Sequence, residues 1–173
     1  SMAYALDSSY RTEHHTEEWM PSKNAVMKAH TLTIPDPEET VPFFDRNGLR
    51  ISVFQADHSP VHPAVGYRFE YRGNVVVISG DTVKTPTLAN FAKDADLFLC
   101  ECSHPDGDTV PYHMTPSEAG THAEQAGVKT LMLTHFYPPC DEVDVVAQAS
   151  ARFGGRIIAA SDLLTVEIRK GKG

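Results

Sequence analysis

From Leu49 onward the chain alternates short apolar runs with turn residues, and this pattern limits the possible folds more than any other feature. Strands are predicted at 49–54, 65–71 and 75–78. The last two are joined by a turn at Arg72-Gly73-Asn74, because Gly73 and Asn74 tolerate the positive φ angles of a tight hairpin. The three strands are therefore expected to form an antiparallel meander.

Helices and strands alternate in the rest of the chain. Apolar spacing predicts a helix over 87–95, followed by a strand at 96–100. Thr115-Pro116-Ser117-Glu118 has the residue types of a capping box with proline at the first helical position, and Gly127 is expected to end that helix. This order predicts an α/β fold with a mixed sheet and flanking helices. The remaining predictions are a strand at 130–133, a helix from about 143 to 153, and two strand segments around Ile157 and Leu163.

The first 48 residues have a different character. They contain an acidic stretch with histidines at 11–19 and a Pro/Glu-rich stretch at 35–39. We interpret 1–48 as an irregular N-terminal segment. The remaining residues, 49–173, are expected to form one domain, since 173 residues with 41% hydrophobic content suffice for one core.

Composition also bears on partners. The formal net charge of −8 argues against nucleic acid as a partner, because phosphates attract basic surfaces. No run approaches the roughly 20 apolar residues of a membrane helix, and no basic-then-apolar leader is present. We therefore expect a soluble, cytoplasmic protein that does not contact membranes.

The chain has three cysteines, an odd number: Cys100, Cys102 and Cys140. The first two lie in an apolar run. A disulfide framework is not expected. We interpret the two neighbouring thiols as small buried apolar side chains rather than zinc ligands.

Three predicted strands run into loops that begin with residues able to bind metal: His58, Asp81 and His135. Two imidazoles and a carboxylate are donors that zinc and similar ions prefer. Each residue alone is also compatible with an ordinary hydrogen-bonded loop residue, and it is the combination that favours metal-assisted hydrolysis. Asp57 could support His58, and Thr82 could hydrogen-bond the Asp81 carboxylate or the turn.

His113 precedes the capped helix. The helix and the strand that follow it can bring His135 back to the same edge of the sheet as His113. It fits a proton donor to a leaving group. The plainer interpretation is that His113 contacts only its own loop.

Four spaced signatures resemble the ribonuclease Z-like branch of the metallo-β-lactamase superfamily, over roughly residues 49–168. Gly66-Tyr67-Arg68 and Ser79-Gly80-Asp81-Thr82 are similar to the third and fourth metal motifs, which implies that His58 binds one metal and Asp81 bridges two. Residues 112–116 and 131–135 are similar to the final stretch, which implies that His113 assists catalysis and His135 is a ligand. The resemblance also implies that Glu101 supports the catalytic histidine.

The family's opening motif, His-x-His-x-Asp-His, matches no segment of this sequence. His14-His15 lacks its alternate spacing and the Asp-His that follows. The resemblance thus implies mainly the C-terminal half of an αββα sandwich, with a site for one or two Zn²⁺ ions, or other divalent metals, that is incomplete in these residues. Because half a sandwich leaves an apolar sheet face, a homodimer or a separate N-terminal half is expected to cover it.

The function implied is a metal-dependent hydrolase in which activated water attacks a small phosphate ester, sulfate ester or lactone. The alternative is a non-catalytic or weakly active remnant that acts through another chain. An RNA-processing nuclease ranks last, because of the net charge and because no segment resembles a tRNA-gripping arm. The sequence does not choose among the esters.

Overall fold

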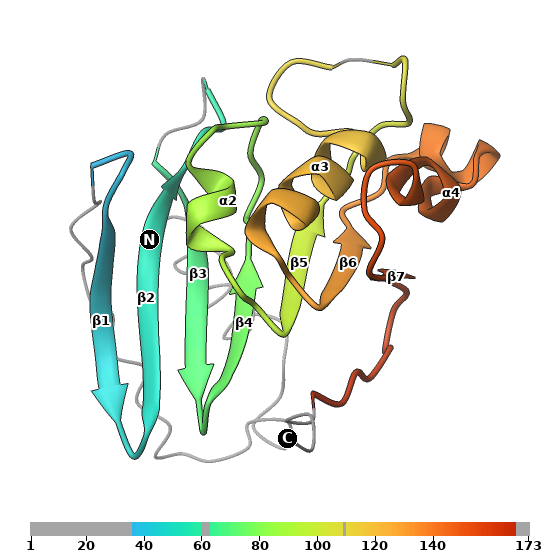
Figure 1. Ribbon diagram of the computed structural model, residues 1–173. Helices are drawn as coiled ribbons and strands as arrows, with labels where there is room; N and C mark the ends of the chain where they lie inside the picture. The colour runs from blue at the N-terminus through green and yellow to red at the C-terminus, as the bar shows by residue number, and fades with distance from the viewer. Residues whose placement is uncertain (1–35, 60–62, 109, 169–173) are drawn as a thin grey trace, which may run out of the picture. The chain divides into compact units, whose positions relative to one another are not determined.

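The computed structural model describes residues 36–59, 63–108 and 110–168, and all of them lie within one compact unit, Ile34–Gly173. They form a seven-stranded sheet whose order in space follows the chain from β1 to β7 (Figure 1). Strands β1 to β4 pair antiparallel, and β4 to β7 pair parallel. The strands are β1 (Thr40–Arg46), β2 (Leu49–Ala56), β3 (Ala64–Tyr71), β4 (Asn74–Ile78), β5 (Leu97–Glu101), β6 (Thr130–Thr134) and β7 (Arg156–Ala159).

The mixed pairing gives five strands one direction. Because β2 is antiparallel to β3, and β3 to β4, strands β2 and β4 run the same way as the parallel strands β5, β6 and β7. Their carboxyl ends therefore lie at one edge of the sheet. Ligands of open α/β sheets bind at such an edge.

Strand β1 was not predicted, because 1–48 was interpreted as irregular. It pairs with β2 from Thr40↔Phe54 to Arg46↔Leu49. Asn47 and Gly48 form the turn, with φ of 55° and 78°. Asn-Gly between two strands is a strong hairpin signal, and this dipeptide could have revealed the strand.

The predicted hairpin between β3 and β4 is confirmed, with Tyr71 opposite Asn74. The positive φ angles fall at Arg72 (51°) and Gly73 (77°), one residue earlier than expected. Asn74 instead begins β4. Two central residues with positive φ give the twist that joins paired strands.

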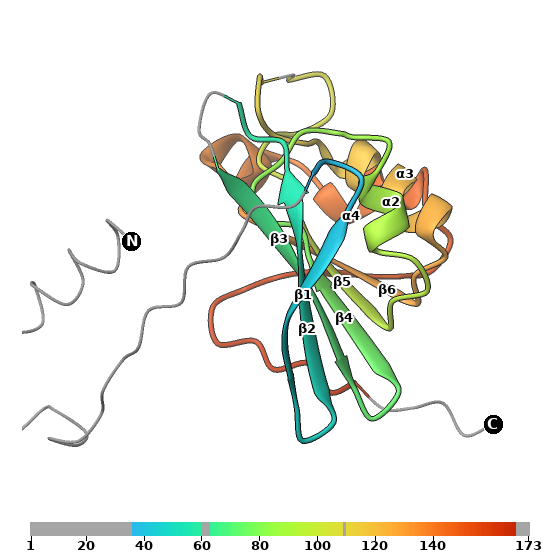
Figure 2. The same cartoon turned by 90° about the vertical axis from the view of Figure 1, so that its left-hand side faces the viewer.

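The helices lie on one face of the sheet (Figures 1 and 2). They are α2 (Leu88–Phe91), α3 (Pro116–Ala126) and α4 (Val145–Ser150), with a 3₁₀ helix, η2 (Pro138–Glu142). The main core lies between the sheet and these helices, and Phe54, Phe98 and Leu131 are among its fully buried members. Within the described ranges, no helix has the length and apolar character needed to cross a membrane.

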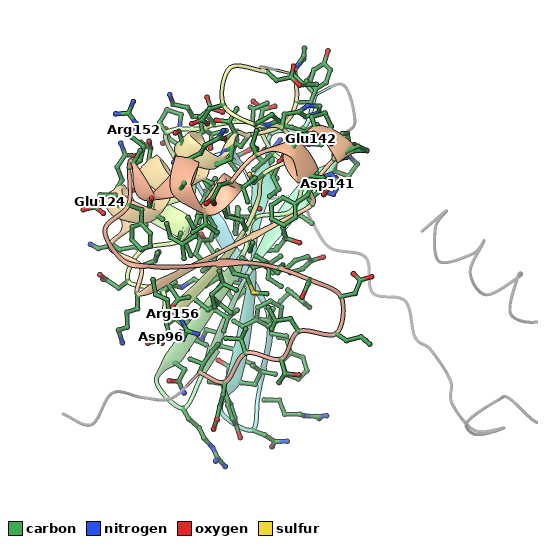
Figure 3. All side chains as sticks on the ribbon, turned by 90° about the vertical axis from the view of Figure 1, so that its right-hand side faces the viewer. Asp96, Glu124, Asp141, Glu142, Arg152 and Arg156 are labelled. Atoms are coloured by element: carbon green, nitrogen blue, oxygen red, sulfur yellow. The ribbon has the colours of Figure 1, made fainter. Side chains whose placement is uncertain are left out.

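Helix α3 has the predicted ends. The backbone N–H of Thr115 donates to Glu118 at 3.2 Å, which forms the glutamate half of the capping box. Gly127 ends the helix in the left-handed conformation, with φ of 64°. Glu124 of α3 and Arg152 after α4 lie on the same side of the molecule (Figure 3), and Glu124 accepts a hydrogen bond from Gly154 N at 3.2 Å.

Three predicted elements differ from the structure. The helix expected at 87–95 is only Leu88–Phe91, and the helix expected at 143–153 is Val145–Ser150. The strand expected around Leu163 is wrong, because that residue has φ of 64° and its side chain is fully exposed. Strand β7 is the last strand of the described sheet, and no described segment pairs with its outer edge.

Candidate active site

Four of the five predicted site residues lie where strands end at one edge of the sheet. His58 follows β2, Asp81 follows β4 and His135 follows β6, while Glu101 is the last residue of β5. These strands run in one direction, so their carboxyl ends bring the residues together. His113 comes from the loop between β5 and α3, which lies at the same end of the sheet (Figure 1).

Glu101 and His113 form a largely buried hydrogen-bonded pair. His113 Nδ1 lies 2.9 Å from Glu101 Oε1, and Glu101 is 1% exposed. The carboxylate also accepts hydrogen bonds from Thr82 N at 3.0 Å, Ser103 Oγ at 3.1 Å and Met114 N at 3.2 Å. Because an ionised carboxylate only accepts, Nδ1 is the protonated nitrogen of the His113 ring. Nε2 is then left to exchange a proton.

His58 is oriented by a backbone carbonyl. Its Nδ1 lies 2.9 Å from the carbonyl oxygen of Tyr112, so this nitrogen donates and Nε2 keeps a lone pair. Metal-binding histidines are commonly held in this way. The His58 ring centroid is 4.9 Å from that of His113.

Asp81 and His135 form the other side of the site. His135 Nε2 lies 3.6 Å from Asp81 Oδ2. This nitrogen is buried and has no hydrogen-bond partner in the part of the chain that the structure describes. His135 also has φ of 64°, which is strained for a residue with a side chain. The His135 and His113 ring centroids are 5.3 Å apart, so all five predicted residues are connected.

Ser103 and Tyr137 contact the predicted site residues but were not themselves predicted. Ser103 Oγ lies 3.1 Å from His113 Nδ1 as well as donating to Glu101. The Tyr137 ring lies 5.5 Å from that of His113 and 5.3 Å from that of His135. Each lies two residues after a predicted site residue, and this proximity in sequence was the available signal.

Asp57 and Thr82 join two of the loops through the backbone. Asp57 N donates to Thr82 Oγ1 at 3.1 Å, and Val83 N donates to Asp57 O at 2.8 Å. The Thr82 hydroxyl itself donates to Val83 O at 3.0 Å, within its own loop, and it accepts from Asp57 rather than bonding the Asp81 carboxylate. Asp57 makes these contacts through its main chain, whereas a supporting role for its carboxylate was expected.

The expected metal ligands form two neighbouring halves rather than one cluster. Among residues 36–59, 63–108 and 110–168, no three His, Cys, Asp or Glu side chains gather closely enough to hold a metal ion. The donor chemistry nevertheless fits a divalent metal, because the buried Nε2 of His135 faces a carboxylate and His58 keeps a free Nε2 lone pair. His14 and His15 lie outside the described residues.

The three cysteines are buried and free, and burial had been predicted for Cys100 and Cys102. Burial raises the pKa of the Cys100 thiol, and the nearby negative charge of Glu101 raises it further. Burial likewise raises the pKa of Cys102 and of Cys140. All three therefore stay thiols at neutral pH, whereas metals bind thiolates.

The sequence matches the Beta-lactamase superfamily domain over residues 4–136, a match that begins within the segment interpreted as irregular. Ribonuclease Z of Mycobacterium tuberculosis H37Rv is 34% identical over 96% of this chain and 62% of its own length. Ribonuclease Z of Mycobacterium marinum is 34% identical over 96% of this chain and 61% of its own length. This chain belongs to the metallo-β-lactamase superfamily, in its ribonuclease Z-like branch. It spans about three fifths of the length of these two relatives.

Two solved structures share the fold. The short form of human tRNase Z aligns with a TM-score of 0.68 and 19% identity, over 98% of this chain and 64% of that chain. The metallo-β-lactamase fold protein YhfI from Bacillus subtilis aligns with a TM-score of 0.61 and 27% identity, over 72% of this chain and 51% of that chain. The predicted α/β fold of the metallo-β-lactamase type is thus confirmed.

The prediction that excluded nucleic acid as a partner is wrong. It relied on the net charge of −8, but the relatives at 34% identity are named ribonucleases, and ribonucleases act on RNA. A net charge sums the whole molecule, whereas a nucleic acid contacts only the surface around its site. An acidic total therefore does not exclude a local binding surface.

Proposed function

We propose that this chain is a metal-dependent hydrolase that cleaves phosphodiester bonds in RNA. The observation that carries the proposal is the Glu101–His113 pair, which lies beside the Asp81–His135 pair and the His58 ring. The arrangement combines a positioned proton donor with donors that suit a divalent metal. Both are needed for metal-assisted hydrolysis.

The phosphodiester is the ester that the relatives support. The sequence alone left phosphate esters, sulfate esters and lactones open. Relatives that match 96% of this chain are named ribonuclease Z, and a ribonuclease hydrolyses phosphodiesters of RNA. The human neighbour of the same fold is named as acting on tRNA, which makes a tRNA transcript a reasonable first substrate.

His58, Asp81 and His135 are the residues that would hold the metal, with Zn²⁺ as the first candidate. When bound, a divalent cation supplies a hydroxide nucleophile at neutral pH and stabilises negative charge on phosphate oxygens. Further ligands must come from outside the described residues, since three side chains do not complete a two-metal site. Asp81 is central because its carboxylate lies next to the buried His135 Nε2.

His113 would donate a proton to the leaving oxygen. Its Nδ1 is engaged with Glu101, so the proton leaves from Nε2. Glu101 stabilises the imidazolium and holds the ring, and it acts through His113 rather than on the substrate. Proton donation by a positioned side chain typically contributes about 10²- to 10⁴-fold in rate.

A groove of about 510 Å³ lies next to the end of β2, the strand that leads into His58, and offers room for the RNA chain. Its lining includes the carboxylates of Glu38 and Asp57, and Lys84 is its one cationic side chain among the described residues. Lys84 is exposed and lies three residues after Asp81, where its ammonium group can reach a phosphate. The groove thus supports a polymeric substrate that extends past the reacting phosphate.

A substrate panel tests the proposal. Purified protein with added Zn²⁺ is assayed on a labelled tRNA transcript, on bis(p-nitrophenyl) phosphate, on p-nitrophenyl sulfate and on a simple lactone. Turnover of the two phosphodiesters is expected, and the His113→Ala variant should lower the RNA rate by about 10²-fold or more. The matched control is His122→Leu, at a buried histidine of α3 outside the site, which should keep the wild-type rate at neutral pH.

Two outcomes would contradict the proposal. Turnover of the sulfate or the lactone without the phosphodiesters would assign a different substrate class. No turnover of any substrate by metal-loaded protein would instead support the non-catalytic remnant.

A further inference from the structure

His104 has a buried ring nitrogen without a partner among the described residues. Its Nε2 has essentially no exposed surface, and the side chain is 12% exposed. Its Nδ1 lies 3.2 Å from Asp108 Oδ2. Because a carboxylate accepts, Nδ1 carries the proton, and Nε2 is an acceptor. A buried acceptor costs folding free energy until it meets a donor.

This acceptor lies beside the proposed proton donor. His104 and His113 line the same cavity of about 110 Å³, next to the start of α3. The ring of Tyr137 packs against both, with centroids 5.1 Å from His104 and 5.5 Å from His113. A volume of this size holds a few water molecules, each of which takes about 30 Å³ in the liquid, or one small substituent of a substrate.

The cavity suits a neutral donor better than an anion. Asp108 is hydrogen-bonded to His104, and Glu118 lines the cavity, so two carboxylates would repel a phosphate. A hydroxyl group can donate to Nε2 at no such cost. If the 3′ oxygen of a ribose is the leaving group, the nearest hydroxyl is the 2′-hydroxyl on the neighbouring carbon. DNA lacks this hydroxyl.

We propose that His104, held by Asp108, accepts a hydrogen bond from the 2′-hydroxyl of the nucleotide whose 3′ oxygen leaves. This inference rests on the proposed function. In that reaction water adds to phosphorus, the bond from phosphorus to the 3′ oxygen breaks, and His113 gives a proton to that oxygen. His104 takes no proton. It selects ribose over deoxyribose at the sugar next to the broken bond.

A double-mutant cycle between enzyme and substrate tests this role. The cleavage rates of wild-type protein, His104→Phe and His104→Gln are measured on an all-ribose RNA. The same enzymes are then assayed on RNAs with one 2′-deoxy or one 2′-fluoro nucleotide on the 5′ side of the cleaved bond. Any effect of the sugar on the leaving oxygen itself is common to all enzymes, so it cancels in the cycle. A 2′-deoxy nucleotide on the 3′ side is the control.

The ratio of the rate on all-ribose RNA to the rate on either modified RNA should be about tenfold larger for wild-type protein than for His104→Phe, as expected for one hydrogen bond. His104→Phe should also cleave the all-ribose RNA more slowly than wild-type protein does. His104→Gln places an amide near Nε2 and should recover part of the discrimination. Because each ratio compares two RNAs with one protein preparation, partial unfolding of a variant does not alter it.

The failures are distinguishable. If wild-type protein cleaves RNA but His104→Phe discriminates ribose as wild type does, the role of His104 is wrong and the proposed function stands. If wild-type protein cleaves no RNA, the proposed function fails, and the role of His104 fails with it.

Discussion

Glu101 is buried, and its carboxylate accepts hydrogen bonds from three separate stretches of chain. Thr82 lies after β4, Ser103 after β5, and His113 just before α3. One carboxylate therefore fixes both His113, the proposed proton donor, and the turn that contains Asp81. Loss of one acceptor would leave buried donors unpaired, which typically costs about 1–3 kcal/mol.

Replacing Glu101 with glutamine tests this role. An amide nitrogen in place of one oxygen cannot accept, so His113 loses its orientation and its imidazolium loses a counter-charge. We expect kcat for RNA cleavage to fall by roughly 10²-fold and urea unfolding to show a loss of about 1–3 kcal/mol. The matched control is Glu142→Gln, at an exposed position on η2 (Figure 3), which should change neither. Unchanged kcat in the Glu101 variant would contradict the role.

His122 makes stability depend on pH. It lies in α3 at 2% exposure, and neither ring nitrogen has a hydrogen-bond partner in the described ranges. Burial, with a smaller effect of the nearby Lys84 charge, lowers the pKa of His122 to about 4. The folded pKa is thus below the ordinary value of 6.5, so the unfolded chain binds the proton first as the pH falls.

The stability that His122 contributes is therefore complete above pH 6.5 and is lost between pH 6.5 and about 4. Between about pH 7.5 and 5, this group should reduce the free energy of unfolding by roughly 2 kcal/mol. Urea titrations at the two pH values measure it. His122→Leu should show a smaller loss than wild type by that amount, and equal losses in the two proteins would refute the assignment.

At the scale of elements, the end of β4 depends on Gly80. This residue has φ of 65°, and a Cβ atom there would collide with the backbone carbonyl oxygen of Val65 in β3. Only glycine lets the chain turn so close to the neighbouring strand before Asp81. The turn places the Asp81 carboxylate near His135.

Gly80→Ala should destabilise the protein by about 2 kcal/mol or more, because it combines a strained φ with a backbone clash. Gly48→Ala is the matched control, since Gly48 also has positive φ, at 78°, but has open space where the Cβ would lie. It should cost only about 1 kcal/mol. Thermal or urea unfolding compares the two, and equal costs would mean that the clash is relieved.

Helices and strands were predicted well where nearby residues determine their ends, and poorly where pairing with a distant strand determines whether they form. The ends of α3 follow from Pro116, Glu118 and Gly127, which act within one or two turns. The strand predicted around Leu163 did not form: the backbone has φ of 64° there, and an apolar run does not itself specify which strand it pairs with. Strand β1 was missed although Asn47-Gly48 marked its turn.

The site was predictable as a list of strand ends, but not as a set of contacts. His58, Asp81 and His135 stand out because each follows an apolar strand. The contacts of Tyr137 and the unpaired nitrogen of His104 depend on how the β5–α3 loop packs, which no local pattern specifies.

For the molecule as a whole, the question is how a chain with a net charge of −8 would hold RNA. Association must depend on a few basic groups near the site rather than on the total charge. Lys84 lines the groove next to the end of β2, so it is the first such group.

Lys84→Gln should raise KM for RNA by about threefold to tenfold, because it removes one phosphate contact. It should leave KM for bis(p-nitrophenyl) phosphate almost unchanged. Lys93→Gln is the matched control, since Lys93 is an exposed lysine at the far end of α2. Steady-state kinetics at constant salt measures all three proteins. An equal rise of KM in both variants would point to the total charge instead.

The most direct test measures the rate of RNA cleavage by wild-type protein and by Asp81→Asn. Each protein is assayed after a chelator removes metal, and again after Zn²⁺ or another divalent ion is restored. Wild-type activity should fall to background without metal and return with it. Asp81→Asn should stay at background in both conditions, while its unfolding transition resembles that of wild type. Wild-type cleavage that persists in chelator, or an Asp81→Asn variant as active as wild type, would contradict a metal-dependent site built on Asp81.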